Sequence, residues 1–204
     1  MKILLYMAHP RLDRSEINRP MFELAQRMGG ITCVDLYADY PQLCIDVDKE
    51  QSRLLAHDVI ILQHPLFWYS SPAILKEWQD RVLEYGFAYG HDSHALEGKY
   101  VFNAVSCGAM EEAYQPKGAN GADVRTLLIP FEKSFDLCRM TYLAPFALFS
   151  SGRAREMGSD KRHMQQWQNL LISLRDGTLD LKAAKSARSL NQILPRTALQ
   201  MENA

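Results

Sequence analysis

Residues 59–82 read VIILQHPLFWYSSPAILKEWQDRV, and this stretch decides the fold. It starts with a strand candidate at residues 59–63, whose first four residues are all aliphatic, which is typical of a strand buried on both faces of a sheet. It ends with a helical pattern in which four apolar side chains share one side: Ile74, Leu75, Trp78 and Val82. We expect Ser71 to cap this helix and Pro72 to be its first residue. A buried strand followed by an amphipathic helix is the repeating unit of a parallel sheet.

The same alternation of apolar runs and amphipathic stretches extends along most of the chain. Further strands are predicted at residues 2–7, 32–36, 100–105 and 143–149. Further helices are predicted from Asn18 to the Gly29-Gly30 pair, at 123–138 with a break at Pro130, and at 159–174. Five strands joined by helices predict an α/β protein with a parallel sheet and helices on both faces.

Composition restricts the class of protein further. The chain has 204 residues, of which 47% are hydrophobic and 23% charged, and its formal net charge is -1. Such a chain can bury a full core in one domain, so disordered, collagen-like and coiled-coil classes are excluded. The near-neutral balance, without a cluster of lysine and arginine, also excludes a nucleic-acid partner bound through its phosphates.

The cysteines and the ends of the chain predict a cytoplasmic protein. Four cysteines are widely scattered, without a zinc pattern: Cys33, Cys44, Cys107 and Cys138. The N-terminus enters an apolar strand directly and lacks the pattern of a signal peptide. Because the apolar stretch at 143–149 is far below the roughly 20 residues of a membrane span, membrane contact is expected to be peripheral, at the inner face. Periodicity thins beyond Gly177, so we expect one domain at residues 1–176 and a tail or partner-binding arm at 177–204.

Three loops at the carboxyl ends of the predicted strands are candidates for a ligand site, since ligands of open parallel sheets bind at that edge. The first loop, residues 9–18, leads into a helix whose N-terminus favours an anion, and His9, Ser15 and Asn18 add donors. Glycines for a Walker A or dinucleotide loop are missing, so side chains and N–H groups would hold a phosphate. The alternative is that Ser15 or Asn18 merely caps the helix.

The other two loops point to a flat ligand. Phe67, Trp68 and Tyr69 occupy a turn bracketed by prolines, where polar residues are usual, and such a surface suits stacking on a planar ring. Residues 106–110 are mostly small, which lets backbone approach a ligand closely. Together the three loops predict one site for a planar ring that carries a phosphate.

These residues resemble the flavodoxin-like NAD(P)H:quinone oxidoreductase family, and most of all its bacterial branch of ancillary subunits of glutathione-regulated potassium-efflux systems. The resemblance spans residues 2 to about 175, and its markers are the segments 6–10, 63–78, 86–90, 96–99 and 138–146 with Ser15 and Asn18. It implies a flavodoxin-like three-layer sandwich, with the five-stranded sheet in the order 2-1-3-4-5. It also implies a flavin, FMN in this small branch and FAD in larger relatives, with NAD(P)H as co-substrate.

The resemblance assigns flavin-binding roles residue by residue. The phosphate and ribityl region would be held by residues of the first loop: His9, Ser15, Glu16, Ile17 and Asn18. The isoalloxazine ring would be lined by the aromatic loop: Leu66, Phe67, Trp68 and Tyr69. Its opposite edge would meet the small-residue loop: Ser106, Cys107, Gly108 and Ala109.

Two departures from the family pattern concern chemistry. The family usually has paired threonines and then paired glycines where this chain has Ser106 to Ala109, so Ala109 adds a methyl group. Tyr114 matches a tyrosine that acts over the flavin in animal relatives, but Asn120 replaces the accompanying histidine and cannot shuttle a proton near neutral pH. Tyr89 resembles the aromatic residue that family homodimers offer across their interface.

Two functions follow from this reading. The first is hydride transfer from NAD(P)H through FMN to a quinone. The second is a regulatory ancillary subunit that binds and activates a potassium-efflux antiporter, for which the basic residues Lys182, Lys185 and Arg188 offer a partner surface.

Several other residues that could suggest chemistry have simpler interpretations. His91 and His94 make an incomplete metal site, so no metal is expected. His57 and His64 are expected to be structural, and Cys107 inert. Arg153 and Arg155 are either solvated surface residues or attract the phosphate of NADP.

Overall fold

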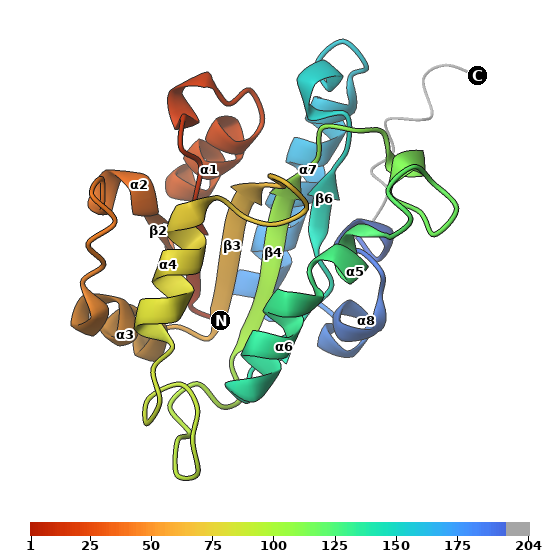
Figure 1. Cartoon of the computed structure of the whole chain (residues 1–204). Helices are drawn as coiled ribbons and strands as arrows, with labels where there is room; N and C mark the ends of the chain where they lie inside the picture. Colours follow the sequence, from red (N-terminus) through yellow and green to blue (C-terminus); the bar gives the residue numbers. More distant parts are fainter. Residues whose placement is uncertain (195–204) are drawn as a thin grey trace.

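A parallel sheet forms the central layer of the computed structural model, which describes residues 1–194 (Figure 1). Its strands are β1 (Ile3–Met7), β2 (Ile31–Asp35), β3 (Val59–Pro65), β4 (Tyr100–Ser106), β5 (Thr141–Tyr142) and β6 (Phe146–Leu148). The order is β2-β1-β3-β4-β5, and β6 also pairs with β4. The predicted fold class and strand order are confirmed, since every described pairing is parallel.

The fifth strand differs from the prediction of one run at 143–149. It consists of β5 and β6, both paired with β4 and interrupted around Pro145. Proline has no N–H to give to a ladder, and the N–H of Ala144 turns away to the carbonyl of Ala184. At the second strand, Leu36 begins a helix instead of ending the strand, because Asp35 accepts from the N–H groups of Tyr37 and Ala38 and caps that helix.

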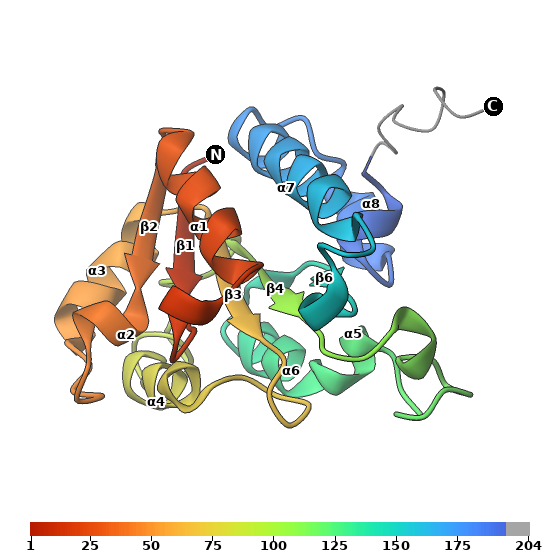
Figure 2. The same cartoon turned by 90° about the horizontal axis from the view of Figure 1, so that it is seen from above.

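Eight helices are described among residues 1–194, and they cover both faces of the sheet (Figure 2). They are α1 (Asn18–Arg27), α2 (Leu36–Asp39), α3 (Val47–Ala56), α4 (Ala73–Val82), α5 (Val124–Leu127), α6 (Ile129–Leu137), α7 (Ser159–Arg175) and α8 (Leu181–Ser186). The break predicted at Pro130 is confirmed as the boundary between α5 and α6. The cap of α4 differs, because Pro72 occupies the N-cap position and no Ser71 side chain bonds to the helix.

Because successive side chains of a strand point to opposite faces of the sheet, the strands contribute to two hydrophobic cores. On β1, Leu4 and Tyr6 face one cluster with α4 and α6, whereas Ile3 and Leu5 face a second cluster with α1 and α7. Trp78 on α4 and Trp167 on α7 are fully buried, one on each side. A sheet buried on both faces explains the near-continuous apolar runs of the sequence.

Part of the expected tail packs on the second core. Ala184 and Leu190 are fully buried beside α7 and β6, and the N–H of Leu190 donates to the carbonyl of Pro145 at 2.9 Å. Asn191 Oδ1 accepts from the N–H of Ala147 at 2.9 Å and so covers the free edge of β6. The boundary expected at residue 176 therefore falls inside the packed part of the chain. Residues 195–204 of the expected arm lie outside the described residues.

No helix within residues 1–194 is long and apolar enough to cross a membrane.

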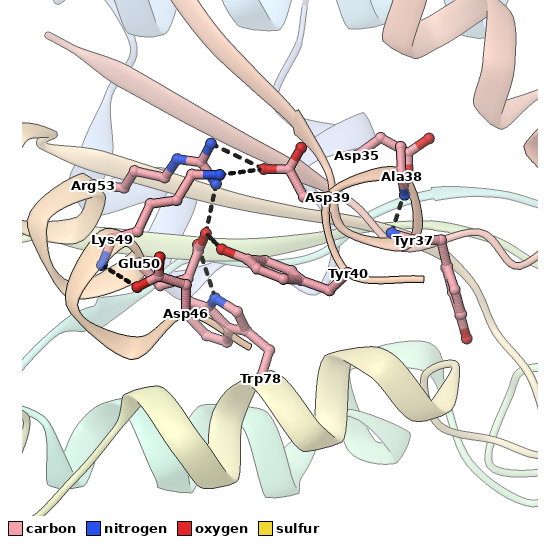
Figure 3. Close-up of polar contacts among 10 residues, drawn as sticks. All are labelled: Asp35, Tyr37, Ala38, Asp39, Tyr40, Asp46, Lys49, Glu50, Arg53 and Trp78. Atoms are coloured by element: carbon pink, nitrogen blue, oxygen red, sulfur yellow. Dashed lines mark hydrogen bonds and ion pairs between the residues drawn. The ribbon is translucent and has the colours of Figure 1, made fainter. Parts of the chain in front are cut away.

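A buried carboxylate ties α2, α3 and α4 together (Figure 3). Glu50 has no exposed surface, and its Oε1 accepts from the hydroxyl of Tyr40 at 2.6 Å and from Arg53 Nη1 at 2.5 Å. Its Oε2 accepts from Trp78 Nε1 at 3.1 Å. Arg53 also binds Asp39 at 3.0 Å. We name these residues the Glu50 cluster; every polar group in it that points inward has a partner, which makes its burial tolerable.

Candidate functional site

The candidate site lies at the carboxyl end of the sheet, where the arrowheads of β3 and β4 point (Figure 1). Loops that follow β1, β3, β4 and β6 surround two cavities of about 520 and 570 Å³. The cavities share Leu66, Phe67 and Gly108. The three loops singled out in the sequence therefore do meet at one place.

The first cavity carries polar groups from the loop before α1. Its lining from this loop is His9, Arg14, Ser15, Glu16, Ile17 and Asn18. Within the described chain, the backbone N–H groups of Glu16 and Ile17 donate to no protein acceptor. Free N–H groups just ahead of a ten-residue helix form an environment that favours an anion.

Ser15 and Asn18 belong to a fixed hydrogen-bond network as well as to the cavity wall. Ser15 Oγ accepts from the N–H of Asn18 at 2.9 Å, so it satisfies the first N–H of α1, although Ile17 and not Ser15 occupies the N-cap position. Asn18 Nδ2 donates to Ser106 Oγ at 2.8 Å, and Gln63 Nε2 donates to the carbonyl of Asn18 at 2.8 Å. Because Ser106 Oγ already accepts one bond, its own proton remains available to a ligand in the cavity.

His9 is placed to donate rather than to carry charge. Its Nδ1 accepts from the N–H of Arg11 at 3.1 Å, so the neutral ring carries its proton on Nε2. Burial lowers the pKa of His9, and the carboxylates of Asp13 and Asp35 oppose that shift. The ring lies edge-on to Phe67 with 6.3 Å between centroids.

The aromatic loop after β3 adopts a strained turn. The N–H of Phe67 donates to the carbonyl of Ser70 at 3.0 Å, and the N–H of Ser70 donates back at 2.9 Å. Between them Trp68 and Tyr69 both have positive φ, 49° and 63°. This is the arrangement of a type I′ turn, which favours Asn-Gly, and left-handed backbone costs other residues about 1–2 kcal/mol each. Trp68 is 93% exposed, so the strain presents an aromatic side chain to solvent beside the cavity.

The second cavity is the more apolar one and holds the candidate catalytic tyrosine. Its lining includes Trp68, Tyr69, Ala109, Tyr114 and Asn120. Tyr114 is buried against Phe149 with 5.5 Å between ring centroids, and burial raises the pKa of its hydroxyl. The hydroxyl of Tyr69 donates to Asn120 Oδ1 at 3.3 Å, which leaves the Asn120 amide group as a free donor. Tyr114 and Asn120 can thus donate hydrogen bonds to a ligand, but the amide of Asn120 holds no transferable proton at neutral pH.

Cys107 is the one sequence-predicted site residue that lines neither cavity. Its side chain is fully buried in the first core, and burial raises the pKa of its thiol to about 12. Its N–H donates to Leu148 and its carbonyl accepts from Ser151, so both backbone groups are used within the fold. The small side chain fits the core below the loop, in agreement with the inert reading.

Sequence reasoning missed four residues of the first cavity. Arg14, Pro65, Ser151 and Gly152 also line it. Ser151 and Gly152 follow β6, at the same carboxyl edge as the other loops, so the edge rule applied to the fifth strand would have found them. Ser150 before them has a left-handed φ of 54° and its N–H is bound to the carbonyl of Ala109, which fixes the start of this loop.

The remaining candidate residues lie away from the cavities. His64 is fully buried, where Asn103 Nδ2 donates to its Nε2 at 2.9 Å, and burial lowers its pKa to about 4. His57 bonds to Thr32 and to the carbonyl of Arg53. The loop that contains Tyr89 follows α4 and lies at the opposite end of the sheet (Figure 1). In the part of the chain that is described, no three metal-ligating side chains come together, around His91 and His94 or elsewhere.

Comparisons with known proteins find relatives along most of the chain. The glutathione-regulated potassium-efflux system ancillary protein KefG of Pectobacterium carotovorum is 42% identical over 168 residues, which are 81% of this chain and 92% of that protein. The structure of general stress protein 14 from Treponema denticola, in complex with FMN, has a TM-score of 0.77 and 34% identity, and covers 88% of this chain and 100% of that chain.

A third comparison and the family search extend this result. An NADPH-quinone reductase from P. pentosaceus has a TM-score of 0.74 and 36% identity, and covers 83% of this chain and 97% of that chain. A family model described as flavodoxin-like fold matches residues 1–171. The resemblance inferred from the sequence is thereby confirmed, and the chain belongs to the family of proteins with the flavodoxin-like fold.

Proposed function

We propose that the chain is an FMN-dependent oxidoreductase that transfers a hydride from NAD(P)H to a quinone. The observation that carries this proposal is the pair of connected cavities, one with anion-binding groups and the other with aromatic walls. A flavin mononucleotide has the same two parts, a phosphate on a ribityl chain and a flat ring. The FMN-bound neighbour from Treponema denticola and the quinone-reductase neighbour support the assignment.

The residues present fit such a cofactor. The free N–H groups of Glu16 and Ile17 and the hydroxyl proton of Ser106 would meet the phosphate and ribityl oxygens. Leu66 and Phe67, shared by both cavities, would contact the ring where its two ends join. A flavin bound there would supply hydride acceptance from the nicotinamide and hydride donation to the second substrate.

The protein's own contribution to such a reaction is positioning. Phe67 and Trp68 would limit one face of the ring, and the exposed backbone of Gly108 and Ala109 would approach its edge. Tyr114 and Asn120 would donate hydrogen bonds to a quinone oxygen in the second cavity. Asn120 has no proton to transfer near pH 7, so a proton for the reduced quinone would come from Tyr114 or from solvent.

The test is to purify the protein, record its absorption spectrum and identify the released cofactor. We expect bound FMN and oxidation of NADH or NADPH with a soluble quinone. Phe67→Ala should weaken FMN binding, while Leu55→Ala, which removes an exposed apolar side chain from α3 outside both cavities, should not. A colourless protein that takes up no added FMN and oxidises neither nucleotide would overturn the proposal.

We also propose that the active form is a homodimer. Tyr85 and Tyr89 pack edge to face at 5.7 Å in an exposed loop, and Trp68 leaves one wall of the second cavity open to solvent. An aromatic loop from a second copy would close that wall. Sedimentation should give a dimer, and a monomer with full FMN occupancy would contradict this expectation.

A second candidate function is the regulation of a potassium-efflux transporter, and the 42% identity to KefG favours it. Lys182, Lys185 and Arg188 are exposed on and beside α8, and Arg188 also pairs with Asp123 at 3.5 Å. Reversing all three to Glu should abolish capture of such a transporter, whereas Lys161→Glu with Arg162→Glu on α7 should not. The reversal is preferable to truncation after Gly177, because truncation would remove buried core residues. A reversal that leaves capture and efflux unchanged would exclude this surface.

A further inference from the structure

One ion pair connects the two loops that form the mouth of the first cavity. Arg155, in the loop after β6, lies with its Nε 3.8 Å from Glu16 Oε2, in the loop before α1. Ser151 and Gly152 of the same loop after β6 line the cavity, as does Glu16. The pair therefore spans the opening next to the free N–H groups of Glu16 and Ile17.

The contact is loose enough to be exchanged. Both side chains are 57% exposed, and 3.8 Å is longer than a hydrogen bond, so the guanidinium donors of Arg155 are not committed to Glu16. Exposed pairs of this kind contribute little to stability. The loop itself is anchored, because the N–H of Ser150 bonds to Ala109 and that of Ser151 bonds to Cys107. The backbone ahead of Arg155 is thus held by hydrogen bonds, while the exposed side chain of Arg155 can change partners.

The charges around the first cavity indicate why a bound anion would draw Arg155 away from Glu16. Glu16 is the only carboxylate among the described residues that line the first cavity, and Arg14 is the only arginine among them. Arg14 lies 4.0 Å from Asp13, which Arg11 already binds, so its guanidinium is also free to meet an anion. A dianion entering this cavity would therefore meet one carboxylate and one arginine, and Arg155 would supply a second positive charge if it turned from Glu16 toward it.

We propose that Arg155 is a phosphate-binding residue that selects FMN over riboflavin and FAD, with Glu16 as the partner that it leaves when the phosphate binds. Guanidinium forks match the terminal oxygens of a phosphomonoester in two parallel hydrogen bonds. Riboflavin has no phosphate, and FAD offers at this point a diester that carries less charge and continues into an AMP moiety. The inference rests on the proposed function, since it assigns the phosphate of FMN to the first cavity.

The 2′-phosphate of NADPH presents the same chemistry and is the alternative source. It would bind with the substrate, so its effect would appear in the Michaelis constant for NADPH and not in cofactor binding. Glu16, which Arg155 approaches at 3.8 Å, lines the cavity with the free N–H groups and not the cavity with Tyr114 and Asn120, and this favours the cofactor phosphate.

The experiment measures the dissociation constants of FMN, riboflavin and FAD for the apoprotein by flavin fluorescence. Arg155→Ala should weaken FMN binding about tenfold, the loss expected for one screened charge-assisted contact, and leave riboflavin within about twofold. Glu16→Gln should strengthen FMN binding by about threefold, because it removes both the competitor and a repulsive charge. Arg27→Ala, which removes an equally exposed arginine from an ion pair with Glu23, is the matched control and should change neither value.

The possible results distinguish a failure of this inference from a failure of the proposed function on which it rests. Wild-type protein that binds no flavin ends both proposals. Normal FMN binding in Arg155→Ala, or an equal loss of FMN and riboflavin, overturns the inference alone. An unchanged FMN affinity with a raised Michaelis constant for NADPH but not for NADH assigns Arg155 to the substrate instead, and this also overturns it. The FMN effect of Arg155→Ala should shrink as ionic strength rises, as expected for an exposed charge.

Discussion

Two glutamate–arginine pairs in this molecule have the same chemistry and opposite surroundings. Glu50 and Arg53, both on α3, meet at 2.5 Å beside α4, where Tyr40 and Trp78 also donate to the carboxylate (Figure 3). Glu16 and Arg155 meet at 3.8 Å across the mouth of a cavity, and both are largely exposed. The first pair can exist only in one geometry, whereas the second can open without leaving a buried charge.

The difference separates a structural pair from one available for binding. A buried carboxylate must keep its partners because the loss of any of them leaves an unsatisfied group in a medium of low polarity. An exposed pair exchanges partners with water or ligand at little cost. The residue types of an ion pair therefore indicate little about its role, whereas the burial of the pair distinguishes a structural role from a binding role.

Removing the carboxylate of Glu50 should have the largest effect on stability. Glu50→Ala leaves Arg53 without its inner partner and the donors of Tyr40 and Trp78 unsatisfied, so we expect a loss of about 3–5 kcal/mol in the free energy of unfolding. Denaturant unfolding measures it. Glu23→Ala, which removes a carboxylate placed between two arginines on the surface of α1, should cost less than about 0.5 kcal/mol. Equal losses in the two variants would break the comparison.

A second prediction concerns buried histidines, which stay neutral inside the protein instead of forming ion pairs. Burial lowers the pKa of His163 to about 3, and its Nε2 has no partner among the described residues. Its native pKa lies below the ordinary value of 6.5, so the unfolded chain binds the proton first as pH falls. The stabilisation is complete above pH 6.5 and is lost progressively below it, by about 2 kcal/mol at pH 5.

His163→Phe should therefore gain about 2 kcal/mol relative to wild type between pH 7.5 and pH 5, measured by unfolding at both values. Phe should retain the stack that His163 makes with Phe146, whose centroid lies 4.3 Å away. His64→Phe should give a similar relief in acid but lose stability at pH 7.5, because the amide of Asn103 loses its acceptor. A pH dependence unchanged in both variants would show that these rings are not the groups that titrate.

A smaller effect is expected from relief of the strained turn, which should raise the stability of the protein and weaken its FMN binding. Trp68→Asn places a residue that tolerates positive φ at the first position of the type I′ turn, so we expect a gain of about 1 kcal/mol in stability. The same change should weaken FMN binding by removal of an aromatic wall. Leu43→Asn, at an exposed residue with a positive φ of 60° outside both cavities, serves as the control for FMN binding. A less stable Trp68→Asn protein would show that the turn is not strained.

The smallest effect on stability is expected at the mouth of the first cavity. Glu16→Gln and Arg155→Ala should each change the free energy of unfolding by less than about 0.5 kcal/mol while moving FMN affinity in opposite directions. Thermal unfolding of the apoprotein measures the first quantity. A loss of stability as large as that of Glu50→Ala would assign the exposed pair to the fold.

Much of the fold could be predicted from the sequence because its signals are local. The aliphatic runs, the helical spacing of Ile74 and Trp78, and the break at Pro130 depend on near neighbours in the chain, and all are present in the structure. The loops at the carboxyl edge could be predicted for the same reason, since a parallel sheet brings the ends of its strands together. The interruption of the fifth strand has a local signal in Pro145, but the residues around it are apolar, and the partner of the Ala144 N–H is Ala184, far along the chain.

By itself, the sequence determined the α/β class, the strand order implied by its family, and the three loops that meet at the carboxyl edge of the sheet. Only the tertiary structure decided that Cys107 faces the core, that residues up to Leu194 complete it, and that Arg155 meets Glu16. It also decided that Glu50 is buried, although its helix carries charged residues on either side of it in sequence. The physical reason is that burial and pairing arise from contacts between segments distant in the chain, whereas periodicity and turn chemistry are properties of each segment alone.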